Sequence, residues 1–190
     1  MLKLWRCKTT WAWYFLALVV VIFDQWTKTI ATEQLIYAEP VRVLSLFNLT
    51  FNYTLLHNTG AAFSFLSEAG GWQRWFFGII AAAVSMLLAV WIAKLQGVKR
   101  WEACALALVL GGAIGNLYDR IALGYVVDFI ALHYRGDAQN YGWPAFNIAD
   151  SAICIGAVML LWDMFFGSQA SSKKSAQSQD SIHNNPQEKR

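Results

Sequence analysis

The sequence contains little charge. Asp, Glu, Lys and Arg together make up 14% of its 190 residues, whereas hydrophobic residues make up 57%. A water-soluble domain carries roughly 25% charged residues, so this composition argues against an ordinary soluble globular protein. The formal net charge is only +3. We therefore expect no nucleic-acid partner.

Motifs for disulfides and metals are also missing. The three cysteines, Cys7, Cys104 and Cys154, are odd in number, far apart and without C-x-x-C spacing, so they predict neither a disulfide framework nor a zinc site. The histidines do not stand at metal-ligand spacing from another ligand; they are His57, His133 and His183. We expect no metal and no cofactor.

Long apolar segments are the main positive feature. A bilayer core requires about 20 mostly apolar residues per helix, and four segments meet this requirement, at residues 11–30, 72–93, 101–118 and 147–166. We interpret the first as an uncleaved helix and not as a secretory signal peptide. No A-x-A-like cleavage site follows it, and helical spacing continues through Asp24 and Lys28. The sequence predicts an all-α membrane protein with four transmembrane helices.

Basic residues indicate how these helices are oriented. Lys and Arg flank the apolar segments at the N-terminus, at positions 94, 99 and 100, and at positions 173 and 174. The positive-inside rule then places both termini in the cytoplasm and residues 31–71 and 120–146 outside. Residues 1–167 are predicted to form one transmembrane domain. Residues 168–190 have almost no apolar content and are predicted to be a disordered, polar cytoplasmic tail.

The first outer segment contains a pattern typical of a strand. Apolar and polar residues alternate from Phe47 to Leu55, which predicts a half-buried strand. Its apolar residues would face lipid headgroups or the bundle, and Asn48, Thr50, Asn52 and Thr54 would face water. Such a strand could pair with an extended peptide by strand addition, or it could simply cap the bundle.

Several polar residues interrupt apolar segments. Asp24 and Lys28 share one helix face. Because inserting a charged side chain into lipid is energetically costly, we expect both to face the bundle or the outer interface. An ion pair between them is favoured over a direct chemical role. Asn116 and Arg120 share the outer end of the third helix. Asp128 follows in an apolar stretch.

Asn147 and Asp150 share the first turn of the fourth helix, where a carboxylate suits the helix dipole. With Asp128 and Asn116, they place two carboxylates and two amides at one membrane level. In the third helix, Ala107, Gly111 and Gly115 form a small-xxx-small face along which another helix can approach closely.

Other functions are compatible with parts of this pattern. Ser64, Ser67 or Ser151 could pair with Lys28 as a Ser/Lys hydrolase, although no local pattern favours it. Intramembrane charges also occur in proton-coupled carriers and small channels, but the two halves of the chain show no internal repeat. A non-enzymatic scaffold would leave the clustered Asn, Arg and Asp residues unexplained.

Five blocks of residues resemble one known family, lipoprotein signal peptidase (signal peptidase II). They occur in the family's order and spacing and cover about residues 10–166. The blocks are Asp24-Gln-Trp-Thr-Lys28, His57-Asn-Thr-Gly-Ala-Ala-Phe63, Gly112-Ala-Ile-Gly-Asn-Leu-Tyr-Asp-Arg120, Val127-Asp-Phe129 and Phe146-Asn-Ile-Ala-Asp150.

The resemblance implies a membrane aspartyl endopeptidase of the bacterial inner membrane. The alternating segment from Phe47 to Leu55 would add a small extracytoplasmic β element after the first helix. Its substrate would be a diacylglyceryl-modified prolipoprotein, cut before the lipidated Cys, and its inhibitor would be the cyclic peptide globomycin. Asp128 and Asp150 would be the catalytic pair. The supporting positions would be Asn58, Gly112, Asn116, Arg120 and Asn147, with Asp24 and Lys28 from the first helix.

Overall fold

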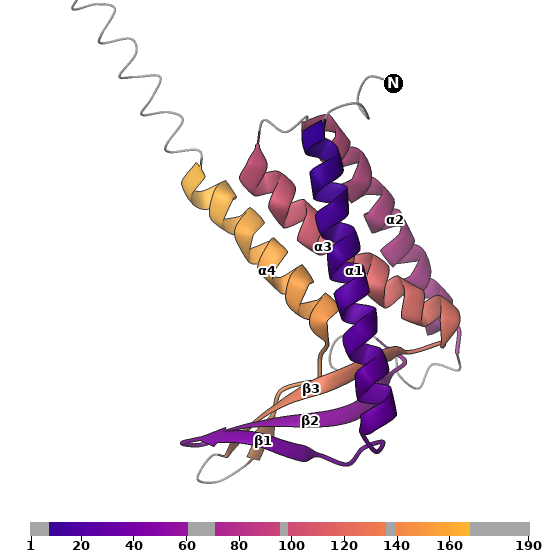
Figure 1. Ribbon diagram of the computed structural model, residues 1–190, viewed down its shortest axis with the longest axis vertical. Coiled ribbons are helices and arrows are strands. Elements are labelled where there is room, and N and C mark those ends of the chain that lie inside the picture. The colour runs from indigo at the N-terminus through magenta and orange to yellow at the C-terminus, as the bar shows by residue number, and fades with distance from the viewer. Residues whose placement is uncertain (1–7, 61–70, 96–98, 136–139, 168–190) are drawn as a thin grey trace, which may run out of the picture.

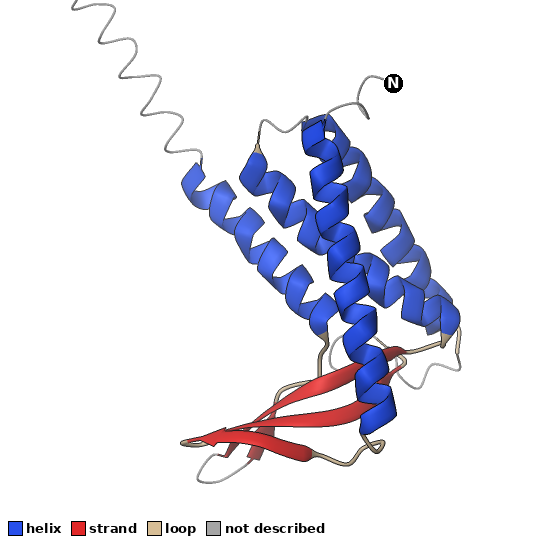
Figure 2. Ribbon diagram, in the orientation of Figure 1, coloured by secondary structure: helices blue, strands red, loops and turns tan. Residues whose placement is uncertain are grey.

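The computed structural model describes residues 8–60, 71–95, 99–135 and 140–167. Within them, four long helices stand side by side and a small sheet lies at one end (Figures 1 and 2). The helices are α1 (Lys8–Gln34), α2 (Gln73–Leu95), α3 (Arg100–Ala122) and α4 (Ile148–Trp162), the last of which continues into a π-helical turn at Asp163–Gly167. All four are long and apolar enough to cross a membrane. The prediction of four spanning helices is confirmed.

α3 is the central helix of the bundle. Over its most apolar stretch 56% of its residues are buried, against 17 to 22% for the other three helices. The predicted small-xxx-small face explains this position, because a Cβ on Gly111 would lie 2.7 Å from the Ala17 carbonyl oxygen of α1. A Cβ on Gly112 would likewise collide with the Ala149 carbonyl of α4. Small residues thus let α1 and α4 approach the backbone of α3.

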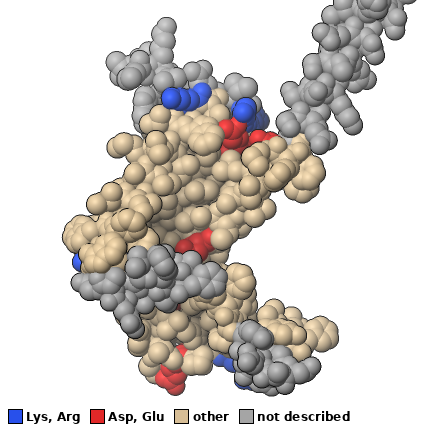
Figure 3. Space-filling view, turned by 180° about the vertical axis from the view of Figure 1, so that it is seen from behind, with Lys and Arg blue, Asp and Glu red and all other residues tan. Residues whose placement is uncertain are grey.

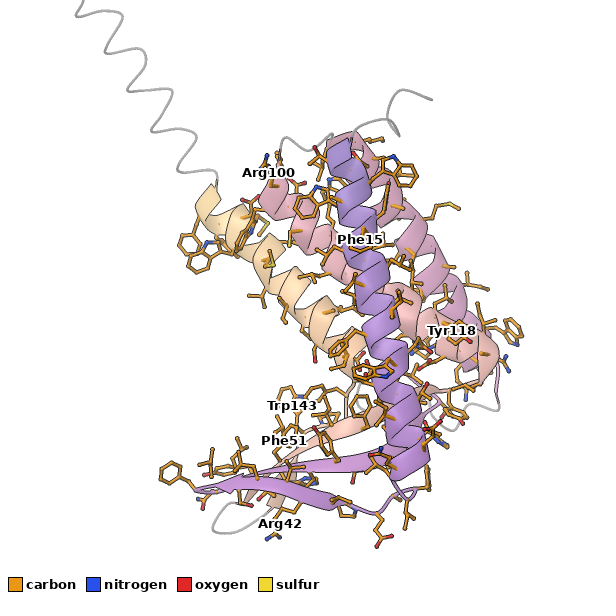
Figure 4. The ribbon with its side chains drawn as sticks, viewed as in Figure 1. Phe15, Arg42, Phe51, Arg100, Tyr118 and Trp143 are labelled. Carbon is orange, nitrogen blue, oxygen red and sulfur yellow. The ribbon has the colours of Figure 1, made fainter. Side chains whose placement is uncertain are left out.

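The outer faces of the bundle are apolar. Phe15 of α1, Ile79 of α2 and Val158 of α4 are 67, 68 and 63% exposed, and Phe15 projects from the bundle in Figure 4. Exposed apolar side chains on several sides of one bundle are unfavourable in water but suit hydrocarbon. The helices therefore bury their small and polar residues and present their large apolar ones outward.

The sheet has four antiparallel strands in the order β1-β2-β3-β4. They are β1 (Val41–Leu46), β2 (Leu49–Asn58), β3 (Val126–Arg135) and β4 (Asn140–Gly142). β3 follows α3 after a short turn, and the chain passes from β4 into α4, so the sheet lies where those two helices end and begin (Figure 1). This arrangement brings β3 beside the first turn of α4.

The predicted strand at 47–55 corresponds to β2, with two corrections. It begins at Leu49, because Phe47 lies in the turn between β1 and β2 with a φ of 51°. Asn52 and Thr54 are largely buried, at 8 and 7% exposed, although both line a hollow along the sheet. β2 is an inner strand between β1 and β3, and the Asn52 amide is hydrogen bonded to His133 Nδ1 of β3 at 3.0 Å.

β1, β3 and β4 were not predicted from the sequence. The predicted polar tail, residues 168–190, lies outside the described residues, and so the proposed division of the chain at residue 167 stays a prediction.

Candidate active site

The carboxylates of Asp128 and Asp150, which the sequence predicts to be a pair, both accept hydrogen bonds from one residue, Asn147. Asp128 lies in β3 and Asp150 in the first turn of α4. Asn147 contacts both, because its side-chain Nδ2 donates to Asp128 Oδ1 at 2.8 Å and its backbone N–H donates to Asp150 Oδ2 at 3.2 Å. Asp128 is 3% exposed and Asn147 is fully buried. The strand and the helix therefore deliver their carboxylates to one buried position.

The start of α4 fixes where Asp150 lies. Asn147 is the N-cap residue, and its side-chain oxygen accepts the backbone N–H of Asp150 at 2.9 Å. Since Asp150 in turn accepts the backbone N–H of Asn147, the two residues form a reciprocal capping box. A carboxylate in the first turn also interacts favourably with the helix dipole.

Asparagine side chains supply most of the other contacts to this pair. Asn58, at the end of β2, donates to Asp128 Oδ2 at 3.0 Å, and Asn116 of α3 donates to Asp150 Oδ1 at 2.8 Å. Each of the four carboxylate oxygens thus accepts one hydrogen bond from an Asn residue. Donors of this kind fix the two carboxylates without adding a positive charge beside them.

Asp128 titrates near neutral pH. Burial is the main cause, the nearby Asp150 carboxylate adds to it, and together they raise the pKa of Asp128 to about 7 despite the opposing hydrogen bonds from Asn58 and Asn147. Removing an ionised carboxylate from water and placing it near a second one both favour the protonated form. Asp128 is therefore able to hold a proton under conditions in which an ordinary aspartate cannot.

A buried ion-pair cluster lies behind the carboxylates. Lys28 of α1 is 3% exposed, and its Nζ lies 2.8 Å from Asp24 Oδ2 and 2.7 Å from Asp119 Oδ2. The third contact of this ammonium is Asn116 Oδ1, at 3.0 Å. Lys28 thereby determines the orientation of the Asn116 amide, because the oxygen faces the ammonium and the nitrogen faces Asp150.

The two partners of Lys28 also hold backbone groups of the site. Asp24 Oδ1 accepts the N–H of Ala149, next to Asp150, at 2.9 Å. Asp119 Oδ2 accepts the N–H of Val127, next to Asp128, at 3.2 Å. Gln25 Nε2 donates to Asp119 Oδ1 at 2.8 Å and to Asp24 Oδ2 at 3.2 Å. The cluster therefore connects α1 and α3 to the segment that carries each aspartate.

Gln25 and Asp119 were not predicted from the sequence to have a role in the site. Both lie inside blocks that carry the family resemblance, next to Asp24 and Arg120 respectively, and this position was the available signal. The predicted preference for an ion pair at Asp24 and Lys28 over a direct chemical role agrees with their position behind the carboxylates.

Arg120 and Gly112 lie near the site but contact neither carboxylate by a hydrogen bond within the described residues. Arg120 donates to the Gly60 carbonyl at 3.2 Å and to the Asn116 carbonyl at 3.3 Å, and its guanidinium stacks over Phe77. It therefore holds the end of β2 against α2 and α3. Gly112 acts through its lack of a side chain, which lets α4 approach α3 at Ala149.

The Ser/Lys alternative is not supported by these contacts. Lys28 Nζ contacts two carboxylates and one amide oxygen, and none of these three partners is a serine hydroxyl. Ser151 donates its hydroxyl to the Asn147 carbonyl at 3.0 Å. Ser64 and Ser67 lie outside the described residues.

The site opens toward one face of the molecule. Figure 3 shows acidic atoms in a hollow between the helical bundle and the sheet. Figure 3 also shows basic atoms at the far end of the bundle. The polar cluster therefore lies at the end of the helices that bears the sheet.

Comparison with known proteins identifies the family. The family model for signal peptidase (SPase) II matches residues 16–166. The lipoprotein signal peptidase of Teredinibacter turnerae is 58% identical over 83% of this chain and 89% of its own length. That of Pseudomonas putida is 50% identical over 90% of this chain and 92% of its own.

Solved structures agree with this match. A bacterial membrane enzyme determined at 2.3 Å resolution by the in meso method has a TM-score of 0.66 and is 30% identical, covering 94% of both chains. A second bacterial membrane enzyme, at 1.9 Å, has the same TM-score and is 32% identical, covering 82% of this chain and 93% of its own. The four-helix bundle with its outer sheet is thus shared with known membrane enzymes, and the chain belongs to the signal peptidase II family.

Proposed function

We propose that this chain is an aspartic endopeptidase that removes the signal peptide from lipid-modified prolipoproteins, with Asp128 and Asp150 as its catalytic dyad. The observation that carries the proposal is the pairing itself. Two carboxylates from different elements share Asn147, and all four of their oxygens are fixed by Asn donors. Membership of the signal peptidase II family supports the same activity.

The dyad acts as one base and one acid. Asp128 holds a proton up to about pH 7, whereas Asp150 lies in the first turn of α4, where the helix dipole interacts favourably with a carboxylate. Asp150 takes a proton from a water molecule as the water oxygen attacks the scissile carbonyl carbon, and Asp128 donates its proton to the carbonyl oxygen. The resulting gem-diol collapses when Asp150 returns its proton to the departing amide nitrogen and Asp128 recovers a proton from a hydroxyl.

The supporting residues keep this pair in a productive geometry. Asn58, Asn116 and Asn147 hold the carboxylates, while Arg120 orders the adjoining segment through the Gly60 carbonyl. A displacement of about 1 Å at such a site costs on the order of 100-fold in rate. The mechanism requires neither a covalent intermediate nor an added metal.

The membrane contributes to substrate selection. The enzyme lies in the bacterial inner membrane with both termini in the cytoplasm, and the site faces the outer side. Cleavage before a diacylglyceryl-modified Cys lets the two acyl chains remain in the lipid while the peptide reaches the aspartates. Each buried methylene contributes about 0.8 kcal/mol, so the lipid is a large part of binding, and an unlipidated precursor is a poor substrate.

Cleavage of a lipidated prolipoprotein by the purified protein tests the proposal. Asp128→Asn and Asp150→Asn each keep the shape of the carboxylate but remove its proton exchange, so each variant should lose most turnover while remaining inserted and folded. Globomycin should inhibit the native enzyme, and chelators should have no effect. Near-normal cleavage by either Asn variant at normal abundance would exclude the dyad.

A further inference from the structure

A cavity of about 520 Å³ runs along the sheet. Its walls include Leu56, Asn52 and Thr50 of β2, His133 of β3, Arg42 of β1 and Ala145 before α4. This volume lies within the usual range for ligand pockets. The walls present amide, imidazole, hydroxyl and guanidinium groups as well as apolar surface, so the cavity suits a polar chain.

One end of the cavity lies next to the segments that hold the two aspartates. Leu56 is paired with Asp128 in the register of β2 and β3, and it lies two residues before Asn58, which donates to Asp128. Ala145 lies two residues before Asn147. The same two segments therefore hold the carboxylates and form this end of the cavity.

The other end lies well away from the site. β2 rises about 3.3 Å per residue, so the wall from Leu56 to Thr50 is about 20 Å long, the length of six extended residues. Arg42 is paired with Asn52, about 13 Å or four residues along this wall. It is exposed, has no ion-pair partner among the described residues, and points away from the helices (Figure 4).

The substrate chain extends from the scissile bond in two directions, toward the signal peptide and toward the mature protein. The signal peptide has an apolar core, which belongs in the lipid around the helices. The chain after the cleavage point is part of a protein that functions outside the bilayer, and it must pass over the polar end of the molecule. Within the described part of the chain, the cavity extends from the segments that hold the dyad along β2, away from the helices.

We propose that this cavity is the subsite for the mature part of the substrate, holding about the first six residues after the cleaved bond in an extended form. This inference rests on the proposed peptidase function. Arg42 then lies beside about the fourth of these residues and favours Asp or Glu there. The dyad and the lipid determine where the chain is cut, and the cavity determines which mature sequences are cut fastest.

The test uses the full-length enzyme and synthetic diacylglyceryl prolipoprotein peptides. One series differs only in the length of the mature segment, which ends at the second or at the eighth residue after the cut. The longer substrate should have a several-fold higher kcat/KM, arising mainly from a lower KM. A second series carries Asp or Lys singly at each of the second to sixth mature positions, because the first is the lipidated Cys.

Arg42→Glu and Val43→Glu provide matched variants for the second series. Both introduce a carboxylate into β1, Arg42→Glu changing the charge by two units and Val43→Glu by one, but Val43 is not part of the cavity wall. The native enzyme should prefer Asp over Lys by about two- to fivefold, the usual effect of one exposed ion pair, with a maximum near the fourth position. Arg42→Glu should reverse this preference, and Val43→Glu should leave it unchanged.

The outcomes separate this inference from the function on which it depends. If both substrate lengths are cleaved equally, and Arg42→Glu keeps the native preference, the cavity is not a subsite although the peptidase assignment stands. If no lipidated substrate is cleaved by the native enzyme, the proposed function itself fails. An equal shift in both variants would show a general surface-charge effect and would also reject the subsite.

Discussion

The raised pKa of Asp128 gives the enzyme a defined response to pH. The protonated form is the acid of the proposed mechanism, and it is lost as the pH rises through about 7. We expect kcat to fall above that pH with a slope of one proton, while Asp128→Asn shows only residual activity throughout. A profile that keeps rising well above pH 7 would contradict the assignment of the proton to Asp128.

The same group affects stability in a predictable direction. Between the ordinary aspartate pKa of 3.8 and about 7, folded Asp128 retains a proton that the unfolded chain releases. Stability therefore falls over this range and then levels off. The melting temperature of Asp128→Asn should rise relative to that of the native protein between pH 4 and 7, and the difference should be constant above pH 7.

Among the described residues, Lys28 is the only cation that forms an ion pair with Asp24 and Asp119. Lys28→Met would leave two fully buried carboxylates without it, which typically costs about 3 to 5 kcal/mol. It would also free the Asn116 amide to rotate away from Asp150. We expect a lower melting temperature together with a lower kcat.

Lys94→Met is the matched control, because Lys94 is exposed at the end of α2. Lys94→Met should change neither the melting temperature nor kcat appreciably. Native-like stability and activity of Lys28→Met would show that the buried cluster does not hold the site.

The approach of α4 to α3 depends on Gly112. A Cβ there would collide with the Ala149 carbonyl, one residue from Asp150, so Gly112→Ala should displace the first turn of α4 and reduce activity by on the order of 100-fold. Gly78→Ala is a matched control in α2, because its nearest neighbour would be Leu117 Cδ1 at 3.9 Å. Both substitutions raise helix propensity equally. Equal activity of the two variants would exclude this steric role.

Elements differed in how well the sequence predicted them. The helices were predictable because each needs a long apolar segment, and β2 because its residues alternate. β3 was missed because its sequence from Val126 to Leu132 is almost continuously apolar apart from Asp128, which removes the period-two signal. β1 and β4 are short, at six and three residues, and depend on pairing with their neighbours.

Part of the site was predictable from the sequence because polar residues are conspicuous in apolar segments. Asp128, Asn147 and Asp150 stood out as polar residues in apolar surroundings, and the resemblance named their partners. The roles of Gln25 and Asp119 arise from a contact between residues 94 apart in sequence. No local pattern reveals such a contact, because it exists only once α1 and α3 are packed together.

The whole molecule has a polar end and a basic end. The sheet and the dyad lie at one end of the bundle (Figure 1), while Arg100 lies at the other (Figure 4). The positive-inside rule places the Arg100 end in the cytoplasm, so a reporter fused at residue 97 should be active only inside the cell and one fused at residue 45 only outside. An externally active reporter at residue 97 would invert the orientation and put the dyad on the wrong side.

The capping box of α4 has a consequence for biosynthesis. Asp150 and Asn147 belong to the last spanning helix, and Asp24 of the first helix bonds to Ala149 within it. A nascent chain with only three inserted helices therefore lacks Asp150, the Asn147 side chain that contacts both aspartates, and the hydrogen bond between Asp24 and Ala149. If Asp128 and Asp150 are the catalytic pair, we expect peptidase activity to begin only after the fourth helix has been inserted and has docked against the other three.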